Sequence, residues 1–179
     1  MPGGGGEKDV LDVGCGDGRI DSYLMQKNKK LRIRGIDVLV RPETYIEVME
    51  YDGYHIPLPD NGVDTVMVID VLHHTDDPAR LMKELARVAS SDIIIKDHIR
   101  SDFFSYIKLR LMDYVGNAHY HVRLPYHYMT AKQWEQMFLE NGLHIKKYQT
   151  DLRLYRGIFH HLFDSNLHFI ARLQVGKDL

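Results

Sequence analysis

One stretch decides the fold of this chain: Val10-Leu11-Asp12-Val13-Gly14-Cys15-Gly16-Asp17-Gly18. A short apolar run, typical of a buried strand, leads into glycines at alternate positions, and an amphipathic stretch follows from Arg19 to about Lys29. Glycine permits positive φ angles and, having no Cβ, lets the backbone approach a bound molecule closely. The N-terminus of a following helix offers unpaired N–H groups to a carboxylate or phosphate. The pattern therefore predicts a ligand site at a strand–turn–helix junction.

The spacing of the glycines narrows the class of ligand. Gly14, Gly16 and Gly18 read G-x-G-x-G, whereas the dinucleotide fingerprint G-x-G-x-x-G would need a glycine where Arg19 stands. The stretch resembles the first motif of the class I S-adenosylmethionine-dependent methyltransferases, (V/L)-(L/V)-(D/E)-x-G-x-G-x-G, at every position. The resemblance covers roughly residues 8 to 97 and is closest to the small-molecule subgroup called type 11. It implies S-adenosyl-L-methionine as cofactor, S-adenosyl-L-homocysteine as product and a small molecule as methyl acceptor.

Composition limits the kind of protein. A chain of 179 residues with 44% hydrophobic and 27% charged residues suits one globular domain. The net charge of −2 gives no electrostatic case for a nucleic-acid partner. No apolar run reaches the roughly 18 residues of a membrane span, and no secretory leader is found. The single cysteine, Cys15, suits a reducing compartment. We therefore expect a cytoplasmic protein with no membrane span.

The domain organisation follows from the position of the motif. We expect residues 1–6, rich in glycine, to be a flexible tail or a cloning scar, and residues 7–179 to form a single methyltransferase domain. The resemblance divides this domain into a cofactor-binding half, 7–97, and a substrate-side half, 98–179. Helices that precede the first strand in many of these methyltransferases are missing, so either the chain is truncated or a later segment acts as the lid.

Strand and helix patterns alternate along the chain, which predicts an α/β fold with a doubly wound, mostly parallel sheet. The resemblance implies a Rossmann-like sheet of seven strands that ends in an antiparallel strand pair, with helices on both faces. The predicted helices begin near Arg19, Pro78, Phe103 and Thr130, the last with a capping box and with Trp134 as a core residue. The predicted strands are Asp9–Val13, Leu31–Asp37, Ile46–Glu50, Thr65–Asp70, Asp92–Lys96, Leu143–Thr150 and Leu167–Leu173.

One connection departs from the family pattern. Only about eight residues separate the second and third predicted strands, and Pro42 is among them. A parallel crossover usually takes a dozen or more residues and a helix. We therefore expect Leu39–Tyr45 to be an irregular crossover.

Ligands of doubly wound folds lie beyond the carboxyl ends of the strands, so polar residues at these ends are the site candidates. Asp37 ends the second strand, where an acid accepts hydrogen bonds from the ribose hydroxyls of an adenosine. By resemblance, Asp12 and the glycine turn would position the methionine end and Asp52 the adenine, and the residues after the fourth strand would flank the sulfonium. The predicted cofactor-binding set is Asp12, Gly14, Cys15, Gly16, Gly18, Asp37, Val38, Asp52, Gly53, Asp70, Val71, Leu72 and His73.

The catalytic candidates are Asp97, His98 and His74. The aliphatic fifth strand delivers Asp97 and His98 to the active-site edge, and histidine can take a proton from an acceptor near neutral pH. Eleven histidines raise the question of a metal, but His119 and His121 lack a third ligand at helix spacing and no zinc signature is present. We therefore assign no metal site. The motif Pro125-Tyr126 does not match the tetrad of amino-group DNA methyltransferases, which also favours a small-molecule acceptor.

Two alternatives stay open at this point. An NAD-dependent oxidoreductase would share the strand–turn–helix and Asp37, but its glycine spacing differs and it gives Asp52 no role. An inactive S-adenosylmethionine-binding subunit that assists a partner would explain the short crossover and the missing N-terminal helices. A preference for NAD or for S-adenosylhomocysteine distinguishes the oxidoreductase from a methyltransferase. An assay of methyl transfer distinguishes the inactive subunit from an active enzyme.

Overall fold

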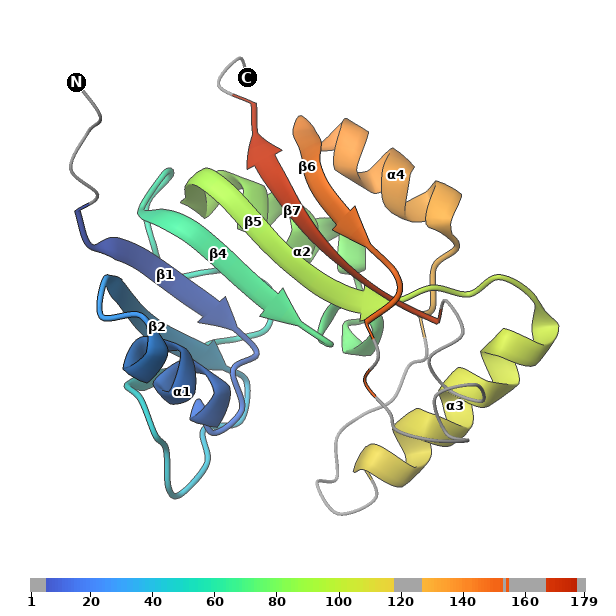
Figure 1. Ribbon diagram of the computed structural model, residues 1–179, viewed down its shortest axis with the longest axis horizontal. Helices are drawn as coiled ribbons and strands as arrows, with labels where there is room; N and C mark the ends of the chain where they lie inside the picture. Colours follow the sequence, from blue (N-terminus) through green and yellow to red (C-terminus); the bar gives the residue numbers. More distant parts are fainter. Residues whose placement is uncertain (1–5, 118–126, 153, 155–166, 177–179) are drawn as a thin grey trace.

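The computed structural model describes residues 6–117, 127–152, 154 and 167–176, and a seven-stranded sheet runs through them (Figure 1). The strand order is β3-β2-β1-β4-β5-β7-β6, and β7 alone runs antiparallel to its neighbours β5 and β6. The predicted fold class, including the antiparallel closing pair, is confirmed. The strands are β1 (Lys8–Val13), β2 (Leu31–Asp37), β3 (Val48–Glu50), β4 (Val63–Ile69), β5 (Ala89–His98), β6 (Leu143–Gln149) and β7 (His168–Val175).

Helices cover both faces of the sheet because the central strands are apolar on both sides. In β1, Leu11 and Val13 belong to a large core cluster, whereas Val10 belongs to a second, smaller one. The large cluster includes residues of α2 (Pro78–Val88) and α4 (Ala131–Glu140), and the small one packs against α1 (Arg19–Lys27). In Figure 1, α1 accordingly lies in front of the sheet and α2 behind it.

The helix starts agree with their sequence signals. Asp77 caps α2 by accepting a hydrogen bond from the Arg80 backbone N–H, and Pro78 occupies the first turn. The predicted capping box of α4 is present between Thr130 and Gln133. Trp134 is almost fully buried, which confirms it as a core residue. The third helix, α3 (Phe103–Asn117), begins at Phe103 as predicted.

The short second crossover is irregular, as predicted. Residues 38–47 contain no helix or strand, and β3 is only three residues long, paired in parallel with the end of β2. Two features differ from prediction. β5 begins directly after α2, at Ala89 rather than at Asp92, because Ala89 already pairs with Val63 ahead of a register shift. A short 3-10 helix, η1 (Leu72–His74), follows β4 and was not predicted.

Some sequence-based predictions lie outside the described residues. The tail residues 1–5, the histidines at 119 and 121, and the Pro125-Tyr126 motif fall in this group. Among the helices that the structure describes, none is both long and apolar enough to cross a membrane.

Arg87 of α2 holds the loop that leads from β3 to β4. Its guanidinium donates to the carbonyl oxygens of Ile56 and Leu58 and to the carboxylates of Asp60 and Glu84, at 2.7–2.9 Å. The hydrogen bonds from Arg87 outweigh partial burial and lower the pKa of Glu84 to about 2. Glu84 also accepts from the Ile56 backbone N–H at 2.9 Å. One ion pair thus fixes the backbone that follows the candidate adenine-side residue Asp52.

We predict that Arg87→Met lowers the free energy of unfolding by about 1.5–3 kcal/mol, the usual scale for hydrogen bonds to charged groups. The melting temperature should fall by roughly 3–12 °C for a domain of this size. Thermal unfolding followed by circular dichroism measures this. The control is Lys83→Met, which removes an exposed positive charge from the same helix. An equal loss of stability in both variants would contradict a specific role for the Arg87 network.

Candidate cofactor and acceptor site

The glycine turn after β1 needs its glycines for two different reasons. Gly14 has a φ of +76°, and a Cβ there would overlap the Cγ2 methyl of Val71. Gly16 has a φ of +60°, but no atom lies within 4 Å of the position that its Cβ would take. A side chain is therefore excluded at Gly14 by neighbouring protein and at Gly16 by backbone strain alone. The space above Gly16 is a cradle that a bound molecule could enter.

Asp37 ties this turn to the end of β2. The Gly16 backbone N–H donates to Asp37 Oδ2 at 2.8 Å, and the Leu39 N–H donates to Oδ1 at 3.0 Å. The Gly14 N–H donates to the carbonyl oxygen of Ile36 at 2.8 Å. Each carboxylate oxygen offers about two acceptor sites, so Asp37 keeps capacity for a further donor on each. An acid held beside open space in this way suits a vicinal diol.

The residues predicted around the adenine lie next to Asp37. A Cβ on Gly53 would lie 3.1 Å from Val38 Cγ1, and the Tyr51 N–H donates to the Asp37 carbonyl oxygen at 3.1 Å. Asp52 is fully exposed, and its Oδ1 accepts from the backbone N–H groups of residues 54 and 55 at 2.8 and 2.7 Å. These bonds lower the pKa of Asp52, which stays ionised. Asp52 therefore stabilises a turn as well as adjoining the candidate site.

Tyr51 is a candidate that sequence reasoning missed. Burial, helped by the negative charges of Asp37 and Asp52, raises the pKa of its phenol to about 12. The hydroxyl therefore stays protonated at the edge of the site. Its only signal in the sequence is its position directly before Asp52 at the end of a strand.

Asp12 lies in β1 beneath the glycine turn and faces a second acid, Asp21 of α1. Both side chains are buried. Burial is the main cause that raises the pKa of both groups, and the charge of Asp21 adds to the effect on Asp12. A buried pair of acids with raised pKa values thus underlies the end of the site at which the methionine part was predicted. Sequence reasoning missed Asp21, although an acid on the inner face of an amphipathic helix is a detectable signal.

Cys15 occupies the turn as a packing residue. A Cβ on Gly35 would overlap its Sγ, so the thiol fills the space that this glycine leaves. Burial, together with the charges of Asp12 and Asp37, raises its pKa to about 12. The thiolate, which is the reactive form, is therefore scarce near neutral pH.

The end of β4 joins the glycine turn to the acceptor side. Asp70 has a φ of +56°, a left-handed conformation that aspartate tolerates better than most residues. Lys96 Nζ lies 2.6 Å from both carboxylate oxygens of Asp70, an ion pair that the sequence did not predict. Val71 packs on Gly14, as described above. The side chains of Leu72 and His73 are buried, so these two predicted cofactor contacts present little side-chain surface to a ligand.

Asp97 and His73 form a buried pair at the ends of β5 and β4. His73 Nδ1 lies 2.6 Å from Asp97 Oδ1, which also accepts from the His98 N–H at 2.7 Å, and the Leu72 N–H donates to Oδ2 at 3.1 Å. Burial by itself would raise the pKa of Asp97. The charge and hydrogen bond of His73, with a smaller contribution from His98, outweigh burial and hold this pKa well below its usual range. Asp97 is therefore an ionised, hydrogen-bonded carboxylate with no access to solvent.

His98 completes this group. Its Nδ1 lies 3.3 Å from His73 Nδ1, 3.5 Å from Asp97 Oδ1 and 3.7 Å from Asp70 Oδ1. The carbonyl oxygen of His98 accepts from Trp134 Nε1 at 2.9 Å, which fixes the backbone at this strand end. Asp97 and His98 are thus brought together as predicted, and His73 joins them.

Two aromatic rings extend this group. The third predicted catalytic residue, His74, has its ring centroid 3.9 Å from that of His73. Tyr128, which sequence reasoning did not assign, lies over both buried histidines, with ring centroids 5.7 Å from His73 and 5.9 Å from His98.

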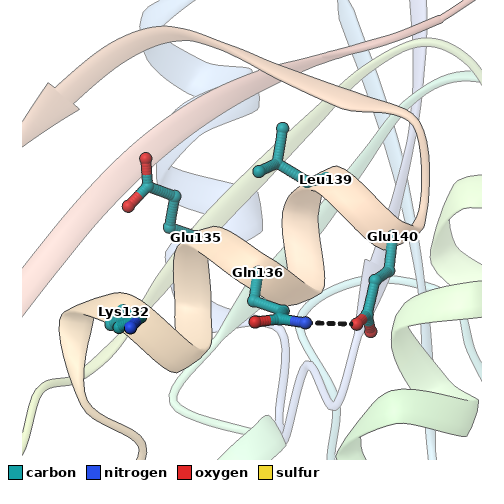
Figure 2. Close-up of a pocket in the computed structure, with 5 residues that line it drawn as sticks. All are labelled: Lys132, Glu135, Gln136, Leu139 and Glu140. Atoms are coloured by element: carbon teal, nitrogen blue, oxygen red, sulfur yellow. Dashed lines mark hydrogen bonds between the residues drawn. The ribbon is translucent and has the colours of Figure 1, made fainter.

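A hollow elsewhere on the surface belongs to a different part of the molecule. Figure 2 shows that the side chains lining it all come from α4. Gln136 Nε2 donates to Glu140 Oε1 at 2.8 Å. It contains none of the predicted site residues. Its lining residues are Lys132, Glu135, Gln136, Leu139 and Glu140.

Comparison with known proteins identifies the fold and then the family. The chain superposes over its whole length on the protein bound to the Haloferax volcanii Trm112 methyltransferase activator, with a TM-score of 0.74, 15% identity and 86% of that chain covered. At this identity the likeness concerns the fold, the Rossmann-like methyltransferase fold with sheet order 3-2-1-4-5-7-6. Residues 11–94 also match the family described as "Methyltransferase domain". This region is a class I S-adenosylmethionine-dependent methyltransferase domain.

Curated relatives agree with this family but differ in acceptor. The chain is 30% identical over 90 residues to the tRNA U34 carboxymethyltransferase of Nautilia profundicola, with 44% of this chain and 29% of that protein covered. It is 27% identical over 110 residues to the ajmaline N-methyltransferase of Rauvolfia serpentina, with 53% and 38% covered. The matched region thus spans well under half of the length of these relatives.

We predict that Asp21→Asn stabilises the protein at neutral pH. An acid whose pKa is higher in the folded than in the unfolded state binds its proton more tightly when folded, so stability declines as pH rises above the unfolded value, near 3.8. Because asparagine cannot ionise, the variant should lose less stability than the unmodified protein as the pH rises. A gain of about 1 kcal/mol would raise the melting temperature by roughly 2–4 °C at pH 7, with a smaller gain at pH 4.5.

Thermal unfolding at the two pH values tests this, with Glu43→Gln as a control that neutralises an exposed acid. A gain that is the same at both pH values, or a loss at pH 7, would show that folding does not raise the pKa of Asp21.

Proposed function

We propose that the protein binds S-adenosylmethionine and transfers its methyl group to a small molecule. The observation that carries the proposal is the hydrogen bond from the Gly16 N–H to Asp37 Oδ2, beside the open space above Gly16. It brings a glycine turn and a diol-binding acid together at the carboxyl ends of β1 and β2, where ligands of doubly wound folds bind. The G-x-G-x-G spacing and the family match over residues 11–94 support the same cofactor.

The residues present suit this cofactor. Asp37 would accept from the ribose hydroxyls, Val38 and Gly53 would border the adenine, and the turn over Asp12 would approach the methionine part. When bound, S-adenosylmethionine supplies a methyl group that its sulfonium already activates. The protein then has mainly to orient the acceptor and exclude water, and orientation alone can contribute several kcal/mol, on the order of 7–11 in the best cases.

The acceptor side lies at the ends of β4 and β5. His98 is the candidate for proton removal, since histidine exchanges a proton near neutral pH. Asp97 is a positioning residue in this proposal, because its carboxylate is fully buried and occupied by three donors. It would fix the tautomer and orientation of His73 and the backbone of His98. His74 remains a candidate through its ring contact with His73.

A small-molecule acceptor is favoured by charge. The chain carries 23 basic and 25 acidic residues, without the excess of positive charge that tRNA binding usually needs. One relative acts on the alkaloid ajmaline, by its name, whereas another modifies tRNA, so the family alone leaves the acceptor open.

The test of cofactor binding is isothermal titration with S-adenosylhomocysteine and with NAD. We expect saturable binding of S-adenosylhomocysteine and none of NAD. Asp37→Ala should weaken this binding about 10- to 100-fold, the equivalent of one or two hydrogen bonds to a charged group. Glu135→Gln, which removes an exposed charge on α4, should leave it unchanged. Binding of NAD in place of S-adenosylhomocysteine, or an unaffected Asp37→Ala variant, would refute this cofactor site.

The test of the acceptor side is methyl transfer to a panel of phenols, amines, quinones and carboxylates. For an acceptor that must lose a proton, His98→Gln should lower kcat by about 10²–10⁴-fold and flatten its pH profile, while the affinity for S-adenosylhomocysteine stays close to that of the unmodified chain. A variant with normal kcat would remove His98 from the mechanism. Cofactor binding without transfer to any panel member would favour the non-catalytic subunit over an enzyme with a small-molecule acceptor.

A further inference from the structure

We propose that Asp70, His73, Asp97 and His98 form a binding site for one divalent transition-metal ion of the Zn²⁺ type. Each residue offers one ligand atom, and the four atoms lie within 4.8 Å of one another. The proposal goes beyond cofactor binding and methyl transfer and does not depend on either. Sequence analysis assigned no metal because the four ligands come from two strand ends and make no compact zinc motif.

The three distances from His98 suit a tetrahedral ion. With metal–ligand bonds of about 2.0–2.2 Å, ligand atoms of a tetrahedron lie roughly 3.3–3.6 Å apart. His98 Nδ1 lies at 3.3, 3.5 and 3.7 Å from the ligand atoms of His73, Asp97 and Asp70. The pair His73 Nδ1 and Asp97 Oδ1, at 2.6 Å, is closer because a proton bridges it. A metal ion would replace that proton, which passes to solvent, and the two atoms would move apart.

The ligand types narrow the choice of ion. Two imidazole nitrogens with two carboxylates suit Zn²⁺, Fe²⁺, Co²⁺ or Ni²⁺ better than Mg²⁺ or Ca²⁺, which prefer oxygen ligands alone. Among these ions Zn²⁺ accepts tetrahedral geometry most readily.

The surrounding residues hold the ligands in place. The Leu72 and His98 backbone N–H groups donate to Asp97, and Trp134 Nε1 donates to the His98 carbonyl oxygen. Outer hydrogen bonds of this kind orient metal ligands and tune their affinity. His73, Asp97 and His98 are buried, whereas the Asp70 side chain is 38% exposed. Asp70 therefore marks the side from which an ion would reach the other three ligands.

Lys96 competes with the metal. Its ammonium lies 2.6 Å from both carboxylate oxygens of Asp70, so it neutralises the ligand on the open side. A metal ion that binds Asp70 must displace this contact. Removal of the ammonium should therefore strengthen metal binding, an effect opposite to that expected from simple damage to the fold.

A bound metal would change the role of His98. As a ligand it could not accept a proton, and four protein ligands would leave a tetrahedral ion no open position for an acceptor. The two states are distinguishable, since a chelator would raise turnover if a metal occupies the site and leave it unchanged when His98 is already free to act as a base.

The test is titration of the untagged, chelator-treated protein with Co²⁺, followed by its visible absorption, and with Zn²⁺ in competition with a chromophoric chelator. We expect one ion per chain for both metals. Asp70→Asn and His98→Gln should weaken binding at least about tenfold, and Lys96→Met should tighten it about tenfold, the scale of changes around a metal site. His55→Gln is the control, because His55 is an exposed histidine paired with Glu84.

Circular dichroism of each variant reports whether it folds. Absence of a saturable Co²⁺ signal in the unmodified chain overturns the metal site and leaves the cofactor proposal intact. The metal site is also overturned if His55→Gln removes the Co²⁺ signal. It is overturned as well if folded Asp70→Asn and His98→Gln variants retain that signal in full. Metal binding without S-adenosylhomocysteine binding would instead refute the proposed function alone.

Discussion

The hydrogen bond from the Gly16 N–H to the Asp37 carboxylate is the interaction on which the candidate cofactor site depends. It fixes the turn after β1 to the end of β2, and the Gly14 N–H bond to the Ile36 carbonyl oxygen supports it. Val71 then packs on Gly14, which places the residues after β4 against the same turn. Three strand ends are thereby held around one open space, so a ligand there would meet all of them.

Two buried acid groups beside this space differ in the direction of their pKa shifts because their partners differ. Asp12 faces another acid, and burial raises the pKa of both members of this pair. Asp97 faces two histidines and two backbone N–H groups, and it stays ionised although it is more deeply buried. The first pair lies under the proposed methionine end and the second at the proposed acceptor end. Donors, rather than depth of burial, thus decide the charge at each end of the site.

The fold class and the irregular second crossover could be predicted from the sequence, because the glycine turn and the alternation of strands and helices are local signals. The antiparallel closing pair was implied by the family resemblance, and the strand order came from the structure. Asp37, Asp97 and His98 were also found from local signals, as polar residues at strand ends. The Asp12–Asp21 pair, the Lys96–Asp70 ion pair and the inclusion of His73 with Asp97 could not be predicted. Each joins residues on different elements, and only the packing of those elements brings them together.

The most direct test of the cofactor site is a pair of ¹H–¹⁵N correlation spectra recorded with and without S-adenosylhomocysteine. The account predicts the largest shifts for the backbone amides of Gly14, Gly16 and Gly18, for Val38 and Leu39, and for residues 52–54 and 70–72. Amides of α4 should stay unchanged. Shifts that are absent from the glycine turn, or that NAD reproduces equally well, would contradict it.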